Sequence, residues 1–328
     1  MKNSPRVKLG ADAKPLLSVI IVSYQVREFL RNCLDSIFKD PPNFSLEVIV
    51  VDNASTDGTS TMLKDFSSKT KIIINDKNVG FSRANNIGIE ASRGEFVLLL
   101  NPDTVMLPGA LDKMLNFMQS HPNIGAMGCR LVDKNGNTQS SCGRHPTPRL
   151  VLPHLFGLCK RIPRLKSFYM SDWNHSSNLM VDWVCAACFL TRRRVINEVG
   201  LLDECLFLYG EEMDWCTRMS MHKWKTAYYS EASVIHYGGE SIMQTTSTQG
   251  KERIDYARLY VSLYRYFSKF YGRATTNTLK FLITILVFLN LFAIMFSPFL
   301  RPRNYATRLM KATGLIRVAF MNMHLLRY

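Results

Sequence analysis

The run Glu95-Phe-Val-Leu-Leu-Leu-Asn-Pro-Asp103 contains both a structural and a chemical signal. Its apolar part ends at Leu100 and is typical of a strand buried inside a parallel sheet. The turn Asn101-Pro102-Asp103 follows at once, and Pro102 stiffens it so that Asp103 presents its carboxylate at the end of the strand. Such turns are common, so the meaning of this one depends on the segments around it.

The segments before this run alternate between strand and helix patterns. Strands are predicted at Leu17–Tyr24, Leu46–Asp52 and Lys71–Asn75, and helices at Arg27–Phe38 and Phe81–Ala91. With the strand at 95–100, this rhythm predicts an α/β protein with a mostly parallel, Rossmann-like sheet and helices on both faces.

Polar residues stand where three of these strands end. Binding sites in sheets of this type gather at the carboxyl ends of the strands. The candidate binding residues at these ends are Ser23, Tyr24, Asp52, Asn53, Asn101 and Asp103.

Two further polar groups lie downstream. A helix that opens within Leu208–Trp215 has three acids in its first turn, Glu211, Glu212 and Asp214. Acids there also stabilise a helix N-terminus, so they carry little functional weight alone. A strand is predicted at Val181–Thr191, and a short one at Ser233–His236.

Five motifs containing these residues occur in one order along the chain. They are VVDNASTDGT (50–59), NVGFSRANNIG (78–88), LLNPDT (99–104), YGEEMDW (209–215) and VIHYGG (234–239). In this order they resemble the family 2 glycosyltransferases, and most closely their rhamnosyltransferase-like branch. The resemblance runs from about Leu16 to Gly272.

The resemblance implies a GT-A fold and an inverting single displacement that uses Mg²⁺ or Mn²⁺. The implied donor is a nucleotide-diphosphate sugar, dTDP- or UDP-linked, with rhamnose as one possible sugar. The implied acceptor is a lipid-linked or polysaccharide glycan of the cell surface.

The resemblance also implies a role for individual residues. Asp52 contacts the base or ribose, Asp103 is the metal-binding acid, His236 is a second metal ligand and Glu212 is the catalytic base. The segment with Asn78, Gly80 and Asn85 is expected to line the donor pocket.

The chain departs from the usual family pattern at two places. Asn101 replaces the first acid of the metal-binding motif, as in the rhamnosyltransferase-like branch, so fewer protein ligands are expected on the metal. Glu211-Glu212 replaces the usual Glu-Asp pair, which leaves Glu211 or Asp214 as alternative bases.

The basic charge is concentrated at the end of the chain. The net charge is +15, yet no acid follows Asp255, while eleven lysines and arginines do. Basic residues lie on both sides of an uncharged run of twenty residues, 281–300. Before that run, Glu252–Tyr271 has a helix pattern with aromatic residues along one face and basic residues beside them. This combination favours an anionic membrane surface over nucleic acid, because the middle of the tail is uncharged and apolar.

The resulting division of the chain has three parts. Residues 1–15 are a basic tail, 16–250 the catalytic domain and 251–328 a membrane-associating region. The expected location is the cytoplasmic face of the cell membrane, either peripheral or with a single crossing at 281–300. Cys185 and Cys188 have no second pair or nearby histidine for zinc, so they are interpreted as buried thiols. The main alternative is an inactive nucleotide-sugar-binding or scaffold protein, which would tolerate loss of Glu212.

Overall fold

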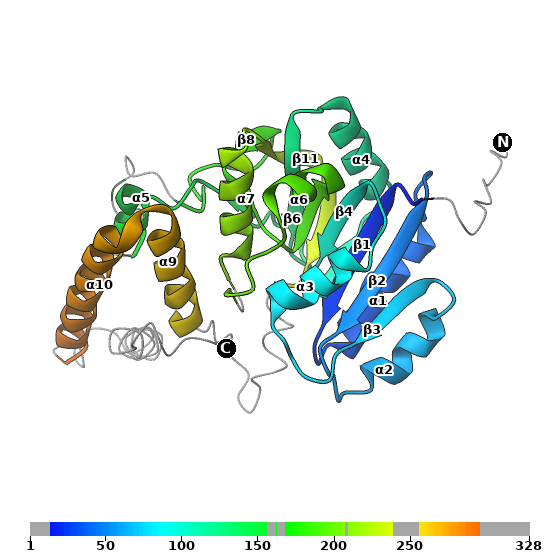
Figure 1. Cartoon of the computed structure of the whole chain (residues 1–328), viewed down its shortest axis with the longest axis horizontal. Coiled ribbons are helices and arrows are strands. Elements are labelled where there is room, and N and C mark those ends of the chain that lie inside the picture. The colour runs from blue at the N-terminus through cyan, green and yellow to red at the C-terminus, as the bar shows by residue number, and fades with distance from the viewer. Residues whose placement is uncertain (1–13, 156–161, 163–167, 207–208, 239–255, 296–328) are drawn as a thin grey trace.

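A central nine-stranded sheet organises the computed structural model, which describes residues 14–155, 162, 168–206, 209–238 and 256–295 (Figure 1). The strand order is β3-β2-β1-β4-β10-β6-β11-β5, and β8 pairs with β11. A separate two-stranded sheet joins β7 (Cys142–Gly143) to β9 (Trp183–Val184). Most of the predicted basic tail, residues 239–255 and residues 296–328 lie outside the described part.

The first half of the sheet is parallel, as the βαβα rhythm predicts. It consists of β1 (Leu17–Ser23), β2 (Leu46–Asp52), β3 (Thr70–Ile74) and β4 (Phe96–Leu100). Every residue of β4 is buried, which explains its continuous apolar sequence.

The second half makes the sheet mixed, so the expectation of a mostly parallel sheet is correct only for the first half. The strand β10 (Cys188–Arg192) runs antiparallel between β4 and β6 (Ile124–Val132). The long strand β11 (Lys225–His236) pairs parallel with β6 and antiparallel with β5 (Thr104–Met106) and β8 (Leu179–Val181).

The predicted strand Val181–Thr191 is wrong as a single element. It is divided into β8, β9 and β10, with a turn at residues 185–187. The backbone N–H of Cys185 donates to the Ser141 carbonyl, which holds the chain beside the small sheet after β9. The chain then returns to the main sheet as β10. The apolar sequence indicated burial, but it carried no sign of this change of sheet.

Helices cover both faces of the sheet, as predicted. On one face, α1 (Arg27–Lys39) and α4 (Ala110–Ser120) bury apolar side chains in the larger core. On the other lie α3 (Phe81–Glu90), α6 (Arg193–Val199) and α7 (Glu211–Met221). The short helix α2 (Thr59–Met62) continues into a 3-10 turn, η1 (Leu63–Phe66).

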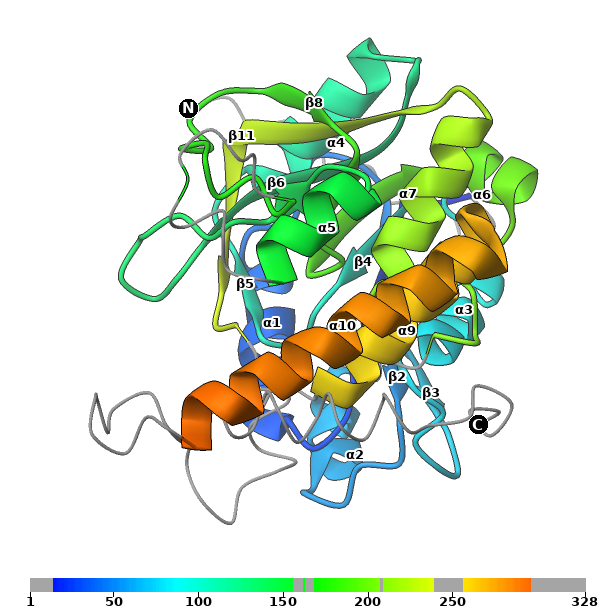
Figure 2. The ribbon, with the colours of Figure 1, turned by 90° about the vertical axis from the view of Figure 1, so that its left-hand side faces the viewer.

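The C-terminal part forms two helices beside α5 (Pro148–Leu155) and α7. They are α9 (Tyr256–Phe270) and α10 (Gly272–Met295), and Figure 2 shows α10 lying across α9. Among the described residues, no helix combines the length and the apolar character that a bilayer crossing requires.

The aromatic face expected at a membrane interface is instead packed inside the protein. Tyr260, Tyr264 and Phe267 of α9 are buried in the same core cluster as Trp215 of α7. Burying these rings against the catalytic half removes more apolar surface from water than leaving them on a free amphipathic helix. The helix α9 (Tyr256–Phe270) is therefore integrated with the fold rather than appended to it.

Candidate active site

Asp103 lies in the turn between β4 and β5, at the carboxyl end of β4. Its side chain is 1% exposed, and neither carboxylate oxygen has a hydrogen-bond donor. Its main-chain carbonyl accepts from the N–H of Tyr237, which fixes the turn against the end of β11. A buried carboxylate without donors is unfavourable unless a cation or a ligand compensates it.

His236 faces this carboxylate from the last position of β11. Its Nε2 atom lies 3.6 Å from Oδ1 of Asp103, because β11 and β5 pair His236 with Thr104. A register shift between Tyr229 and Ser233 bends β11 before it reaches that position.

Gln139 orients the histidine, and the sequence motifs did not reveal it. Its side-chain amide donates to the His236 carbonyl at 2.8 Å, and its Oε1 lies 2.9 Å from Nδ1 of His236. Because the Oε1 of Gln139 can only accept, the neutral ring carries its proton at Nδ1 and donates it to Oε1, which leaves the Nε2 lone pair directed towards Asp103. Burial lowers the pKa of His236 more than Asp103 raises it, which favours the neutral ring that binds metals.

The Asp103–His236 pair fits a divalent cation as a partial site. A carboxylate and an imidazole both suit Mn²⁺, and the carboxylate suits Mg²⁺. No group of three or more acidic, cysteine or histidine side chains with metal-site geometry occurs in the described part of the chain. A cation held here would need its remaining ligands from phosphate oxygens or water, as Asn101 in place of an acid also implies.

A second pair of unsatisfied carboxylates stands at the start of α7. Gly210, at φ 88°, gives the left-handed turn that begins the helix. Glu211 is buried, and Glu212 is partly exposed as a residue, but one carboxylate oxygen of each is buried without a donor. Burial raises the pKa of Glu212 to about 7, and burial plus the charge of Glu212 raises the pKa of Glu211 well above its ordinary value.

Cys185 connects the two acidic groups in space. Burial is the main reason that the pKa of its thiol rises to about 12, and the charges of Glu212, Glu211 and Asp103 add to the effect. The turn at 185–187 therefore lies within electrostatic reach of all three carboxylates. The structure brings together residues that are more than a hundred positions apart in the sequence.

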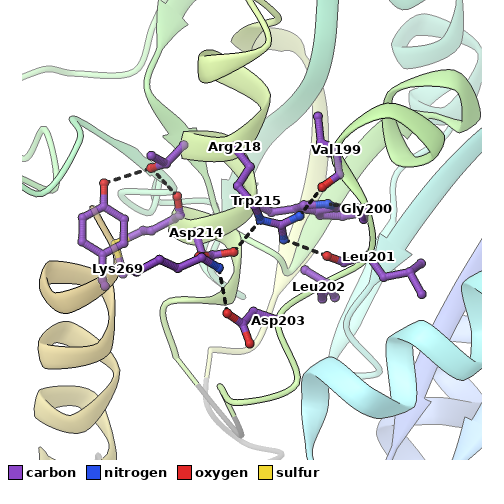
Figure 3. Close-up of polar contacts among 12 residues, drawn as sticks. Val199, Gly200, Leu201, Leu202, Asp203, Asp214, Trp215, Arg218 and Lys269 are labelled. Atoms are coloured by element: carbon purple, nitrogen blue, oxygen red, sulfur yellow. Dashed lines mark hydrogen bonds and ion pairs between the residues drawn. The ribbon is translucent and has the colours of Figure 1, made fainter. Parts of the chain in front are cut away.

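Asp214 lies on α7 in a different environment (Figure 3). One oxygen accepts from Arg218 at 2.8 Å, and the other lies 2.6 Å from Nζ of Lys269. Lys269 also contacts Asp203 at 2.7 Å, and Arg218 donates to the carbonyls of Val199 and Leu201. Both oxygens of Asp214 are thus committed to cations, which favours Glu211 and Glu212 over Asp214 as the base.

Asp52 and its neighbours form the third part of the site, at the ends of β1 and β2. Asp52 is fully buried and accepts from the backbone and hydroxyl of Ser55. Burial raises the pKa of Asp52 despite these bonds. Beside it, the hydroxyl of Ser23 is buried without a partner, so it remains available to a ligand.

The remaining residues predicted to bind the donor are mainly engaged in holding the loops. The amide of Asn53 accepts from Asn75 and donates to the Gly80 carbonyl, while Asn78 accepts from the Gly80 N–H. The side chain of Asn85 donates to the Phe81 carbonyl within its own helix.

Two other predicted donor-binding residues lie at the same edge of the sheet. The N–H of Asn101 donates to the carbonyl of Ala187, so its backbone ties the turn at 101–103 to the turn at 185–187. Tyr24 is half-buried after β1.

Comparison with known proteins gives the chain its relatives. The sequence model of glycosyl transferase family 2 matches residues 18–200. The N-acetylglucosaminyl-diphospho-decaprenol L-rhamnosyltransferase of Mycobacterium tuberculosis is 27% identical over 69% of this chain and 77% of that protein. The low-salt glycan biosynthesis hexosyltransferase of Haloferax volcanii is 27% identical over 82% of both chains.

A solved structure shares the fold. It is a mannosyltransferase from Pyrobaculum calidifontis, in complex with GDP-mannose and Mn²⁺, with a TM-score of 0.57 and 15% identity. The likeness covers 97% of this chain and 89% of that one. At this identity it shows a common GT-A-like α/β fold.

Proposed function

The chain belongs to glycosyl transferase family 2, and we propose that it transfers a sugar from a nucleotide-diphosphate donor to a lipid-linked or polysaccharide acceptor in cell-surface glycan synthesis. The observation that carries this proposal is that Asp103, Glu211 and Glu212, each with a buried carboxylate oxygen that lacks a donor, all lie within electrostatic reach of Cys185. Asp103 faces a histidine that suits a cation, and Glu212, with a pKa raised to about 7, is suited to accept a proton. Rhamnose is the first donor sugar to test, because one relative is a rhamnosyltransferase.

Donor binding would combine two parts of the sheet edge. We assign Asp52 and Ser23 to the nucleoside and Asp103 to the diphosphate, and their positions after β1, β2 and β4 support this assignment. Mg²⁺ or Mn²⁺ would be held by Asp103 and His236, and when bound it neutralises charge on the leaving diphosphate.

Transfer would then be a single displacement. The acceptor hydroxyl oxygen bonds to the anomeric carbon, and the bond from that carbon to the diphosphate oxygen breaks. Glu212 takes the hydroxyl proton, and attack opposite the leaving group inverts the configuration. A carboxylate whose pKa lies near 7 is well matched to accept a proton at neutral pH.

We also propose that the protein lies on the cytoplasmic face of a membrane through α10. Phe281, Ile285, Phe288 and Leu289 form an exposed apolar stripe along this helix. Arg273 and Lys280 lie at its start and no acid occurs in it, which suits an anionic lipid surface.

The decisive experiment offers purified protein a panel of dTDP-, UDP- and GDP-sugars with Mg²⁺ or Mn²⁺. A lipid-diphosphate-linked sugar serves as acceptor. We expect one donor to be consumed with formation of a glycosylated lipid, and Glu212→Gln to bind that donor without transferring it. A folded protein that binds a donor but neither hydrolyses nor transfers it would support the inactive binding protein instead.

A further inference from the structure

A pocket lined mainly by apolar and aromatic side chains lies between α5, the start of α7 and α9. Val151 comes from α5, Phe168 and Tyr169 from the following segment, Met213 from α7, and Tyr260 and Leu263 from α9. No role in donor binding or proton transfer has been assigned to these residues above.

The pocket adjoins the proposed catalytic base. Gly210 and Met213 line it, and they lie on either side of Glu211 and Glu212 in the chain. Tyr169 also lines it, and the charge of Glu212 adds to burial in raising the pKa of the Tyr169 hydroxyl. The lining extends from these residues to Val151 of α5, so an acceptor whose hydroxyl reached Glu212 could place a more distant part of its length along the pocket.

The helices near the pocket differ in charge. Among the described helices, α5, α9 and α10 contain no acidic residue and α10 contacts the other two, whereas α7 carries Glu211, Glu212 and Asp214 in its first turn. The described basic side chains of α5, α9 and α10 are Arg149, Arg265, Lys269, Arg273 and Lys280, of which Lys269 is paired with Asp203 and Asp214. Figure 2 shows these three helices side by side on one flank of the molecule. An apolar pocket beside the basic helices α5, α9 and α10 is complementary to an apolar chain that carries an anionic group.

We propose that this pocket receives the isoprenoid end of a prenyl-diphosphate-linked acceptor, with the diphosphate directed towards the basic flank that α5, α9 and α10 form. The inference rests on the proposed function, because it assigns the lipid part of that reaction's acceptor. A free sugar ring fits the lining less well, since its hydroxyls need hydrogen-bond partners that the mainly apolar walls do not supply.

Filling the pocket tests the assignment. Leu263→Trp is suited to this because Leu263 is only partly buried, so a larger side chain can enter the pocket without disrupting the core. Ile74→Trp is the matched control, since Ile74 is 57% exposed on β3. Thermal unfolding of both variants checks that the fold is intact, and Leu263→Ala is a second variant that shortens the same wall.

Binding is measured with farnesyl diphosphate and inorganic diphosphate, in EDTA so that a cation does not contribute. Wild type and Ile74→Trp should bind farnesyl diphosphate equally, and Leu263→Trp about tenfold or more weakly, which corresponds to the lost burial of one or two methylene groups. Inorganic diphosphate should bind all three proteins alike. Equal binding of farnesyl diphosphate to Leu263→Trp and wild type would overturn the proposal.

Transfer separates this proposal from the parent function. With a long-chain lipid acceptor, Leu263→Trp should raise the acceptor KM and leave the donor KM unchanged. With an acceptor that carries a methyl group in place of the isoprenoid, the variant should match wild type. Loss of transfer to both acceptors in the variant would contradict a lipid pocket, whereas absence of donor turnover in wild type would contradict the proposed function itself.

Discussion

At the scale of single residues, the site is a set of carboxylates that the fold buries without satisfying. Glu212 has a pKa raised from 4.5 to about 7 because burial disfavours its charged form. The folded protein therefore prefers the protonated carboxyl. Its contribution to stability is present below pH 4.5 and is lost as pH rises through about 7.

Glu212→Gln should consequently stabilise the ligand-free fold while it abolishes transfer. At pH 8 we expect a free energy of unfolding higher than that of wild type by at most about 3 kcal/mol, and the difference should vanish near pH 4. Transfer should fall about 100-fold or more because the base is absent. Denaturant unfolding at several pH values, with Glu198→Gln as an exposed control, measures the first effect. A stability difference that did not change with pH would show that Glu212 ionises normally.

Asp103→Asn addresses the other unsatisfied acid. It keeps the shape of the side chain but removes the charge that faces His236. Calorimetric titration with the nucleotide diphosphate should show tight binding in Mn²⁺ for wild type and binding at least about tenfold weaker for the variant. Without metal, the two proteins should bind alike. Asp112→Asn, on the outer surface of α4, is expected to keep the full effect of Mn²⁺, and a similar Mn²⁺ effect in Asp103→Asn would remove Asp103 from the metal site.

At the scale of elements, local patterns predicted the first half of the molecule well. Apolar runs marked β1, β2 and β4, and the polar residues after them do gather at one edge of the sheet. The structure of the second half was harder to predict from the sequence, because it depends on pairing between strands that are far apart in the chain. The division of 181–191 into three strands leaves no periodic signal in the sequence. The same is true of the hydrogen bonds between Gln139 and His236.

The contact between α9 and α7 is another feature that the sequence pattern did not predict. Lys269 reaches from α9 to Asp214, two residues after Glu212 in the first turn of α7, and also to Asp203 before that helix. Tyr266 adds a hydrogen bond to Thr217. The helix that carries the proposed base is thus held by residues outside the five sequence motifs.

Lys269→Met should loosen this contact without removing any proposed catalytic group. It leaves the buried Asp214 paired with Arg218 alone among the described residues, which we expect to cost about 1–2 kcal/mol of stability after allowing for the partial exposure of the lysine. The value of kcat should fall more than the donor KM rises, because the start of α7 shifts while the Asp52 edge is untouched. Lys269→Arg should restore much of the rate, and Lys71→Met on β3 serves as control. If Lys269→Met were less stable but kept the kcat of wild type, the contact between Lys269 and Asp214 would serve stability alone.

At the scale of the whole molecule, the two C-terminal helices differ in what their apolar side chains contact, although the sequence analysis treated them as one membrane-associating region. The rings of α9 are buried against α7, whereas α10 keeps an apolar stripe in contact with solvent. Because α10 also contacts α5 beside the pocket, a membrane bound to the stripe would lie close to the proposed acceptor entrance. This arrangement favours an acceptor that approaches from the lipid surface.

The double variant Phe281→Gln/Phe288→Gln tests this orientation. Both side chains are more than 60% exposed, so their replacement should leave the fold intact. Burying a phenylalanine in the interface contributes about 1.5–3 kcal/mol, so losing two should weaken binding to vesicles with anionic lipid by about 100-fold or more. Transfer to a methyl-diphosphate acceptor in solution should remain at the wild-type rate, while transfer to a lipid acceptor in vesicles should fall. Ile74→Gln, an exposed apolar residue on β3, should change neither measurement. If the double variant bound vesicles as tightly as wild type, the exposed stripe of α10 would not be the membrane-facing surface, and the lipid acceptor would have to enter from another side.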